Sequence, residues 1–259
     1  MDESPFSANS FSKLHNGSSI IFCKTDYIVE ELKRISDIEE DITLITANSD
    51  YSIDENIVDL APKNIKRWFA QNANSSRIIG IPLGMENNVE CKRDGHGVVW
   101  GWAEGKIQKI KEAEDIEPAK EVYANFSIQT NVKDRTALYE KIKDLDYVTN
   151  DVIFNYQENL NRDYGNYVNK ILNHKMSLCP AGNGVDCHRV WEVLYLNRIP
   201  VVKKSKIMNH FEDLPIIFID SWDDLDLEYL LEEYEKVKHN NREKLCFEYW
   251  EKIIKDKNE

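Results

Sequence analysis

Long apolar runs, a surplus of positive charge and paired cysteine motifs are all missing from this 259-residue sequence. No apolar run approaches the ~20 residues that a membrane-spanning helix needs. The N-terminal stretch MDESPFSANSFSKLHNG is polar and lacks the apolar centre of a signal peptide. The five cysteines are an odd number without a Cys-X-X-Cys pair, which is typical of reduced thiols rather than of disulfides or zinc ligands. We therefore expect a cytoplasmic protein with no membrane span and no metal site.

The charge of the chain is negative and unevenly distributed. Its 33 basic and 46 acidic side chains give a net charge of −13, which argues against nucleic acid and anionic membranes as partners. Residues 1–115 hold 13 basic and 20 acidic side chains, residues 116–211 hold 13 and 11, and residues 212–259 hold 7 and 15. The middle segment is therefore the part best suited to a small anionic ligand.

Short apolar runs alternate with segments of helical spacing along the whole chain. In the first half, the runs Ser19–Lys24, Asp41–Thr46 and Arg77–Pro82 predict strands, and Pro62 is expected to open a helix that contains Trp68 and Phe69. The same alternation of predicted strands and helices repeats after a charged segment near residues 105–120. Such alternation indicates parallel sheets that are covered by helices on both faces.

We accordingly predict an α/β protein of two Rossmann-like, doubly wound domains that face each other across a cleft. Residues 1–115 would form the N-terminal domain and residues 116–240 the C-terminal domain, with a last helix in 241–259 that packs back on the first domain. Ligands of such sheets bind where the strands end. The strand-end residues of the first domain include three carboxylates, Asp26, Asp50 and Glu86.

The segment from Leu178 to Val202 reads as strand, glycine turn, helix and strand, a pattern that suits phosphate binding. Gly182 and Gly184 permit backbone N–H groups to approach an anion closely. Asp186 is placed to cap the following helix, and Arg189 in its first turn can bind phosphate with two hydrogen bonds. Glu192 lies one turn further on, where its carboxylate would accept hydrogen bonds from ribose or sugar hydroxyls. The plainer alternative is a glycine turn followed by an Arg–Glu helix pair.

This segment, with its Cys-Pro, spaced glycines, Asp, Arg, Trp-Glu and Ile-Pro-Val, resembles the donor-site signature of the exostosin-like glycosyltransferases. It is most similar to the short branch of ribitol-xylosyltransferase-like enzymes and related enzymes of large DNA viruses. Upstream pieces, in the right order, extend the resemblance over roughly residues 20–225. These pieces are Lys24–Asp26, Ile45–Asp50, Trp68–Asn72, Ile81–Gly84 and Asn125–Arg135. The sequence departs from the pattern at Asn197-Arg198, where a glycine is commoner.

The resemblance implies a GT-B fold and inverting transfer of a sugar from a nucleotide diphosphate to a glycan hydroxyl, with no bound metal. Protein cations would then hold the diphosphate, and UDP-xylose is the first donor to consider. Nucleotide sugar and glycan are the implied partners, and no cofactor is required. The expected donor-binding residues are Ser127, Thr130, Asn131, Arg135, Phe154, Gly182, Asn183, Gly184, Asp186, Arg189 and Glu192.

Inverting transfer needs a base that takes the proton of the acceptor hydroxyl. We expect it among the strand-end carboxylates of the N-terminal domain, with Asp26 first, Glu86 second and Asp50 third. His96 in a glycine-rich loop is a further candidate, and the nearby Trp100 and Trp102 would suit an acceptor sugar if they are not core residues.

Several alternatives remain open at this point. A metal-dependent transferase would need an Asp-X-Asp at a strand end, and Asp224-Leu-Asp226 has that spelling, but its acidic surroundings favour helix capping. The chain would be a nucleotide-sugar or glycan-binding module if it lacked turnover. UDP-glucuronate, UDP-galactose and GDP-fucose are alternative donors. A dinucleotide-binding dehydrogenase is disfavoured because no Gly-X-Gly-X-X-Gly follows the first strand.

Overall fold

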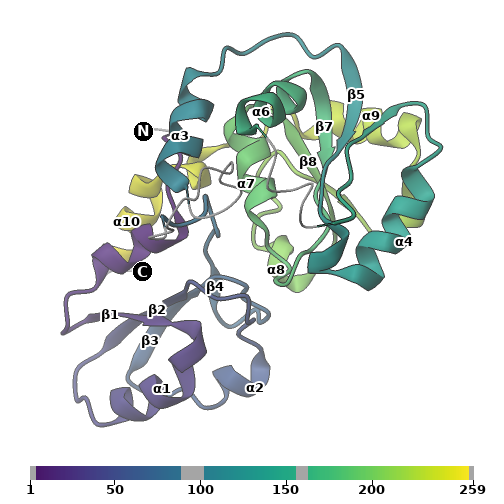
Figure 1. Cartoon of the computed structure of the whole chain (residues 1–259). Coiled ribbons are helices and arrows are strands. Elements are labelled where there is room, and N and C mark those ends of the chain that lie inside the picture. The colour runs from purple at the N-terminus through teal and green to yellow at the C-terminus, as the bar shows by residue number, and fades with distance from the viewer. Residues whose placement is uncertain (1–3, 89–101, 156–162, 257–259) are drawn as a thin grey trace.

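The computed structural model describes residues 4–88, 102–155 and 163–256 of the chain. Within them, two sheets form, and every strand pair in both is parallel (Figure 1). The N-terminal sheet has the order β1-β2-β3-β4, and the C-terminal sheet has the order β6-β5-β7-β8-β9. The strands are β1 (Ile20–Lys24), β2 (Ile42–Ala47), β3 (Ile65–Ala70), β4 (Ile79–Gly80), β5 (Lys120–Ala124), β6 (Val148–Asn150), β7 (His174–Leu178), β8 (Ile199–Lys203) and β9 (Ile217–Ile219).

Helices connect and cover these strands. They are α1 (Ile28–Ser36), α2 (Glu55–Val58), α3 (Ala103–Glu112), α4 (Val132–Ile142), α6 (Tyr164–Leu172), α7 (His188–Tyr195), α8 (Lys206–Asn209), α9 (Leu227–Val237) and α10 (Phe247–Lys255). Short 3₁₀ segments are η1 (Ala8–Leu14), η2 (Thr25–Tyr27), η3 (Ile128–Thr130), η4 (Trp222–Asp224) and η5 (Glu243–Leu245). No helix in the described part of the chain is long and apolar enough to cross a membrane.

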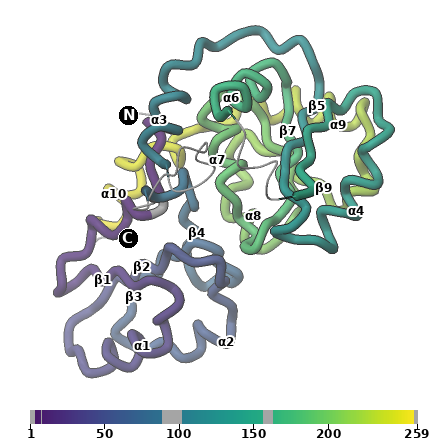
Figure 2. Tube along the Cα trace, viewed as in Figure 1, coloured from purple at the N-terminus to yellow at the C-terminus, as the bar shows by residue number. Residues whose placement is uncertain are grey.

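The two faces of the N-terminal sheet are covered by different parts of the chain. Its strands follow one another without reversal, so the right-handed crossovers place α1 and α2 on the same face. Leu44 and Trp68 point to that face, whereas Phe69 points to the core on the other side. There η1 and α10 meet, with the ring of Phe11 5.5 Å from that of Phe247 and 6.5 Å from that of Trp250 (Figure 2). The two ends of the chain thus close the second face together.

The C-terminal sheet reverses its strand order between β5 and β7. The chain runs from β5 outward to β6 and then returns to β7 on the other side of β5. In doubly wound sheets such a switch point creates a crevice at the carboxyl ends of the two strands, where ligands bind. The loops that meet there follow Ala124 and Leu178. The switch point therefore lies beside the glycine turn that the sequence singled out.

The α/β fold with two parallel sheets, consistent with the Rossmann-like domains of GT-B, is confirmed. The helix expected after Pro62 is wrong, because Trp68 and Phe69 lie in strand β3. The spacing of Ile65, Trp68 and Phe69 imitates a helix, but β3 is an interior strand between β2 and β4 and its end is buried on both faces. A strand that is buried on both faces shows no alternation of apolar and polar residues.

Helix α3, which precedes the expected domain boundary, packs against α6 of the C-terminal half. Ile110 of α3 shares a core with Val168 and Ile171 of α6. An extended segment of residues 113–119 then leads to β5. The polypeptide therefore crosses between the two halves twice, through α3 and again through α10.

Candidate active site

The segment after β7, residues 179–187, forms a loop that we call the glycine loop. Its turn is closed by a hydrogen bond from the N–H of Gly182 to the carbonyl of Gly184, 2.9 Å long. Gly184 is buried against the N-terminal domain, where an added Cβ would lie 3.3 Å from the Asn72 amide nitrogen and 3.4 Å from the Asp50 carbonyl oxygen. The glycine loop thus touches the strand ends of the opposite sheet, as the two facing domains require.

Asp186 of the glycine loop does not cap α7. Cys187 occupies the cap position, and the Asp186 carboxylate instead accepts hydrogen bonds from the Leu83 N–H at 3.0 Å and from Trp191 Nε1 at 2.8 Å. Burial raises the pKa of this carboxyl to about 7, although the N–H donors act to lower it. The expected capping role is wrong, and the contacts of Asp186 are those of a link between the domains rather than of a ligand-binding group.

A second link lies next to Asp186. His188 Nδ1 is 2.8 Å from the carbonyl oxygen of Gly84, and Nδ1 carries the hydrogen because a carbonyl oxygen accepts only. Gly84 has φ +65, and a Cβ there would lie 2.6 Å from the carbonyl oxygen of Phe6. The backbone of residues 83 and 84 is therefore held against the start of α7 from both sides.

Arg189 projects from the first turn of α7. Its Nε atom is buried and has no hydrogen-bond partner, and no ion pair of this side chain is found among the residues that the structure describes. A buried donor of a charged group without a partner is costly. Next to the glycine loop and the N-terminus of α7, such a guanidinium is suited to an anionic ligand.

Arg135, by contrast, is fully occupied by the protein. Its side chain is 4% exposed and donates from Nε to the Ala181 carbonyl at 2.8 Å, from one terminal nitrogen to the Ser127 carbonyl at 2.8 Å, and from the other to the Pro180 carbonyl at 3.1 Å. It also bonds the Thr130 hydroxyl. Burial and the nearby Arg189 lower its pKa to about 10. Arg135 holds the loops after β5 and β7 together at the switch point, which leaves its expected contact with phosphate without support.

The other expected donor residues near the switch point also fall into two groups, those bonded within the protein and those accessible from outside. Asn131 caps α4 and donates from its amide to the Gly182 carbonyl at 3.3 Å, so it supports the glycine loop. Asn183 at the tip of the loop is exposed. Phe154 is 49% exposed and packs edge-on against Tyr139, with 4.7 Å between ring centroids. These positions leave Asn183 and Phe154 accessible to a ligand.

Lys106 joins Glu192 and Glu86 in a buried cluster that was not expected from the sequence. The Glu192 carboxylate accepts hydrogen bonds from the hydroxyls of Tyr164 at 3.2 Å and Tyr167 at 2.9 Å. Lys106 Nζ lies 3.7 Å from Glu192 and 3.1 Å from Glu86. Burial acts to raise the pKa of Glu192, but Lys106, Arg189 and the Tyr167 hydroxyl outweigh it and hold this pKa below its usual range.

The contacts of this cluster argue against the expected role of Glu86 as the base. Glu86 also accepts a hydrogen bond from the Trp102 N–H at 3.0 Å and is 8% exposed, so it is a poor base for a diffusing acceptor. A signal for the cluster existed in α3, where Ala103, Lys106 and Ile110 share one helical face. A lysine on the apolar face of a helix indicates a buried partner of opposite charge.

The two remaining carboxylates lie at the carboxyl edge of the N-terminal sheet. Asp26 follows β1 and pairs with Lys24 at 3.2 Å. Slight burial acts to raise its pKa, but hydrogen bonds from Lys24, the backbone and Ser49 hold it below its usual range. Asp50 is exposed, and its backbone contacts the glycine loop directly, as the Gly184 geometry shows. Of these two residues, Asp50 is the one whose backbone contacts the glycine loop.

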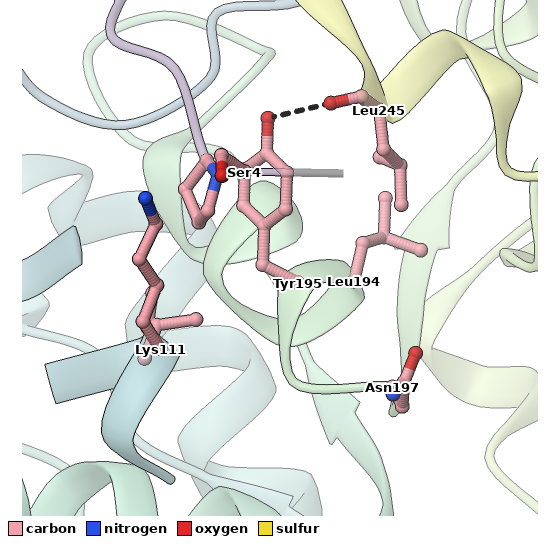
Figure 3. Close-up of a pocket in the computed structure, with 8 residues that line it drawn as sticks. Ser4, Lys111, Leu194, Tyr195, Asn197 and Leu245 are labelled. Carbon is pink, nitrogen blue, oxygen red and sulfur yellow. Dashed lines mark hydrogen bonds between the residues drawn. The ribbon is translucent and has the colours of Figure 1, made fainter. Parts of the chain in front are cut away.

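Other candidates are placed or left aside by the structure. Asp226 caps α9, and Asp224 completes the capping box of η4 with Ser221, as expected from their acidic surroundings. His96 and Trp100 lie outside the described residues. A hollow of about 290 Å³ is lined by Tyr195 and Lys111, and there the Tyr195 hydroxyl donates to the Leu245 carbonyl at 3.2 Å (Figure 3). It lies at the end of α7 opposite Arg189 and is separate from the switch point of the C-terminal sheet.

Comparison with known families decides the identity of the C-terminal half. The sequence model of the RXYLT1 C-terminal domain matches residues 111–253, more than half of the chain. The chain belongs to this ribitol-xylosyltransferase-like family. No curated protein matches the sequence. The RXYLT1-like match spans β5 to β9, the glycine loop and most of α10, and membership indicates a glycosyltransferase with sugar substrates.

Proposed function

We propose that this RXYLT1-like protein is an inverting glycosyltransferase that moves a sugar from a nucleotide diphosphate to a glycan hydroxyl without a metal ion. One observation carries the proposal: the Nε atom of Arg189 is buried without a hydrogen-bond partner among the described residues, beside the glycine loop and at the start of α7. A diphosphate would satisfy that donor and would lie at the switch point of the C-terminal sheet.

The transfer is a single displacement. A carboxylate takes the proton of the acceptor hydroxyl while its oxygen attacks the anomeric carbon from the face opposite the diphosphate. The bond between the anomeric carbon and the diphosphate oxygen breaks, and the nucleotide diphosphate leaves with the electron pair. Arg189 and the backbone N–H groups of the glycine loop stabilise the negative charge that develops on that oxygen.

We assign the base to Asp50, with Asp26 as the alternative. Asp50 is favoured because its backbone lies against Gly184 of the glycine loop and its side chain is exposed. Asp26 is ionised but is already paired with Lys24. Glu86, our second expectation from the sequence, is buried beside Lys106, which argues against it.

UDP-xylose is the first donor to test, and resemblance to the ribitol-xylosyltransferase-like family is its support. The experiment is a thermal-shift screen with UDP, GDP, UDP-xylose, UDP-glucuronate, UDP-galactose and GDP-fucose, followed by measurement of released nucleotide. A ligand that binds the folded state raises the melting temperature. We expect UDP-xylose to raise it and to be turned over in EDTA. Absence of any shift would refute the donor site, and a shift without release would favour the binding module.

A further inference from the structure

One side chain connects the glycine loop to the candidate base. Asn72 follows β3 and is 3% exposed. Its Oδ1 accepts a hydrogen bond from the Asp186 N–H at 3.1 Å, and its Nδ2 donates to the Ser49 carbonyl at 3.3 Å. Asp186 belongs to the C-terminal domain, whereas Ser49 precedes Asp50 at the end of β2. One end of this amide group thus bonds across the domain boundary, and the other end bonds within the N-terminal domain to the residue before Asp50.

The backbone conformation at position 72 favours asparagine. The backbone of Asn72 has φ +51, a left-handed conformation that asparagine adopts more readily than most residues. Gly184 lies directly against the amide, and a Cβ at residue 184 would be 3.3 Å from Nδ2. A longer side chain at either position would push the two loops apart, so the amide fixes their separation at close contact.

We propose that Asn72 is a positioning residue that sets the distance between the donor phosphates and the base. This inference rests on the proposed function, in which Arg189 lies three residues beyond Asp186 and Asp50 directly follows Ser49. The reacting atoms must be held near their productive separation, and a displacement of ~1 Å costs about 10²-fold in rate. The amide acts through the two loops and touches neither substrate.

The decisive variant is Asn72→Gly, because glycine accepts the positive φ while both hydrogen bonds are lost. We expect kcat to fall by about 10- to 100-fold, as a loss of alignment would cause, with the dissociation constant of UDP unchanged. Asn197→Gly is the matched control. Asn197 has φ +55 and is exposed at the end of α7, so this substitution reproduces the backbone effect far from the glycine loop. It should leave kcat unchanged.

A readout without turnover separates this inference from the proposed function. Amide hydrogen exchange should become faster in residues 47–50 and 182–187 of Asn72→Gly together, and in neither segment of the control. Asn72→Asp keeps an acceptor for Asp186 but loses the donor to Ser49, so exchange should rise in residues 47–50 first. Unchanged exchange in residues 182–187 of Asn72→Gly, or a normal kcat, would overturn the inference. If exchange becomes faster in both segments of Asn72→Gly but the wild-type protein transfers no sugar, the proposed function is overturned and the Asn72 link is retained.

Discussion

The Asp186 carboxylate accepts a hydrogen bond from the backbone N–H of Leu83 at 3.0 Å, so the glycine loop is bonded to a strand end of the opposite domain. The second oxygen of the carboxylate accepts from Trp191 within its own domain. The group is buried and has no cationic partner among the described residues. Its carboxylate joins the domains, and removing it should therefore weaken the fold as well as the site.

Asp186→Ala should lower the free energy of unfolding by about 2–5 kcal/mol, because two buried N–H donors lose their acceptor. Urea denaturation of the wild type and the variant measures this loss. Asp134→Ala is a control, since Asp134 is an exposed residue of α4. A loss no larger than that of the control would contradict the role of Asp186 as a link.

The same carboxyl should make stability depend on pH. Burial raises its pKa from 3.8 to about 7, so between these values the folded state binds more protons than the unfolded state. The free energy of unfolding then falls as pH rises through this window and levels off above it. The difference in stability between the wild type and Asp186→Asn, measured in urea from pH about 4 to about 8, should follow this course. A constant difference would refute it.

Arg189→Gln should weaken binding of UDP by about 10- to 100-fold, the loss of one charged contact to phosphate. Stability without ligand should change little, because the Nε atom that the variant removes has no hydrogen-bond partner among the described residues. Titration calorimetry with UDP and thermal unfolding measure the two effects. Lys204→Gln, at an exposed lysine paired with Asp220, is the control and should leave both UDP binding and stability unchanged. Wild-type affinity in Arg189→Gln would remove Arg189 from the donor site.

Arg135→Lys should show the opposite pattern. Lysine cannot reproduce the planar fork that bonds three carbonyl groups, so the variant should lose about 2–4 kcal/mol of stability. Its melting temperature should fall even without ligand, which distinguishes a structural brace from a phosphate ligand. If Arg135→Lys melts like the wild type but no longer binds UDP, the two arginines have the roles that the sequence alone predicted.

Lys106→Met should destabilise the protein by about 3–5 kcal/mol, because it removes the cation that pairs with buried Glu86 and leaves buried Glu192 with Arg189 as its main remaining cation. Adding Glu86→Gln should restore part of the loss, and the double-mutant cycle measures their coupling. Additive effects of the two substitutions would show that the cluster contributes no such coupling.

Asp50→Asn should lower kcat by about 10²- to 10⁴-fold, the usual contribution of a general base. Binding of UDP should be unaffected, because under the proposed function this carboxylate acts on the acceptor hydroxyl. Asp26→Asn and Glu86→Gln, assayed beside it, should retain far more activity. If Asp26→Asn alone abolishes transfer, the base is Asp26, as the sequence first favoured.

The sequence by itself determined the two parallel sheets and the family resemblance, and it predicted a site at the strand ends. Apolar runs such as those of β1, β2 and β7 are local signals, because a strand buried on both faces must be apolar along its length. The glycine loop was also visible, since closely spaced glycines before a helix with an early arginine need no tertiary contact to be noticed. The pattern failed at β3, where burial on both faces removed the periodicity that separates strand from helix.

Only the tertiary structure decided which polar residues hold the domains together and which keep a donor without a protein partner. Arg135 and Arg189 look equivalent in sequence, yet one is surrounded by carbonyl groups and the other keeps an unpartnered nitrogen. The carboxylates of Asp186, Glu86 and Glu192 likewise acquired partners from segments up to 103 residues away. Side-chain direction and long-range pairing set these roles, and neither is encoded in the spacing of residues along the chain.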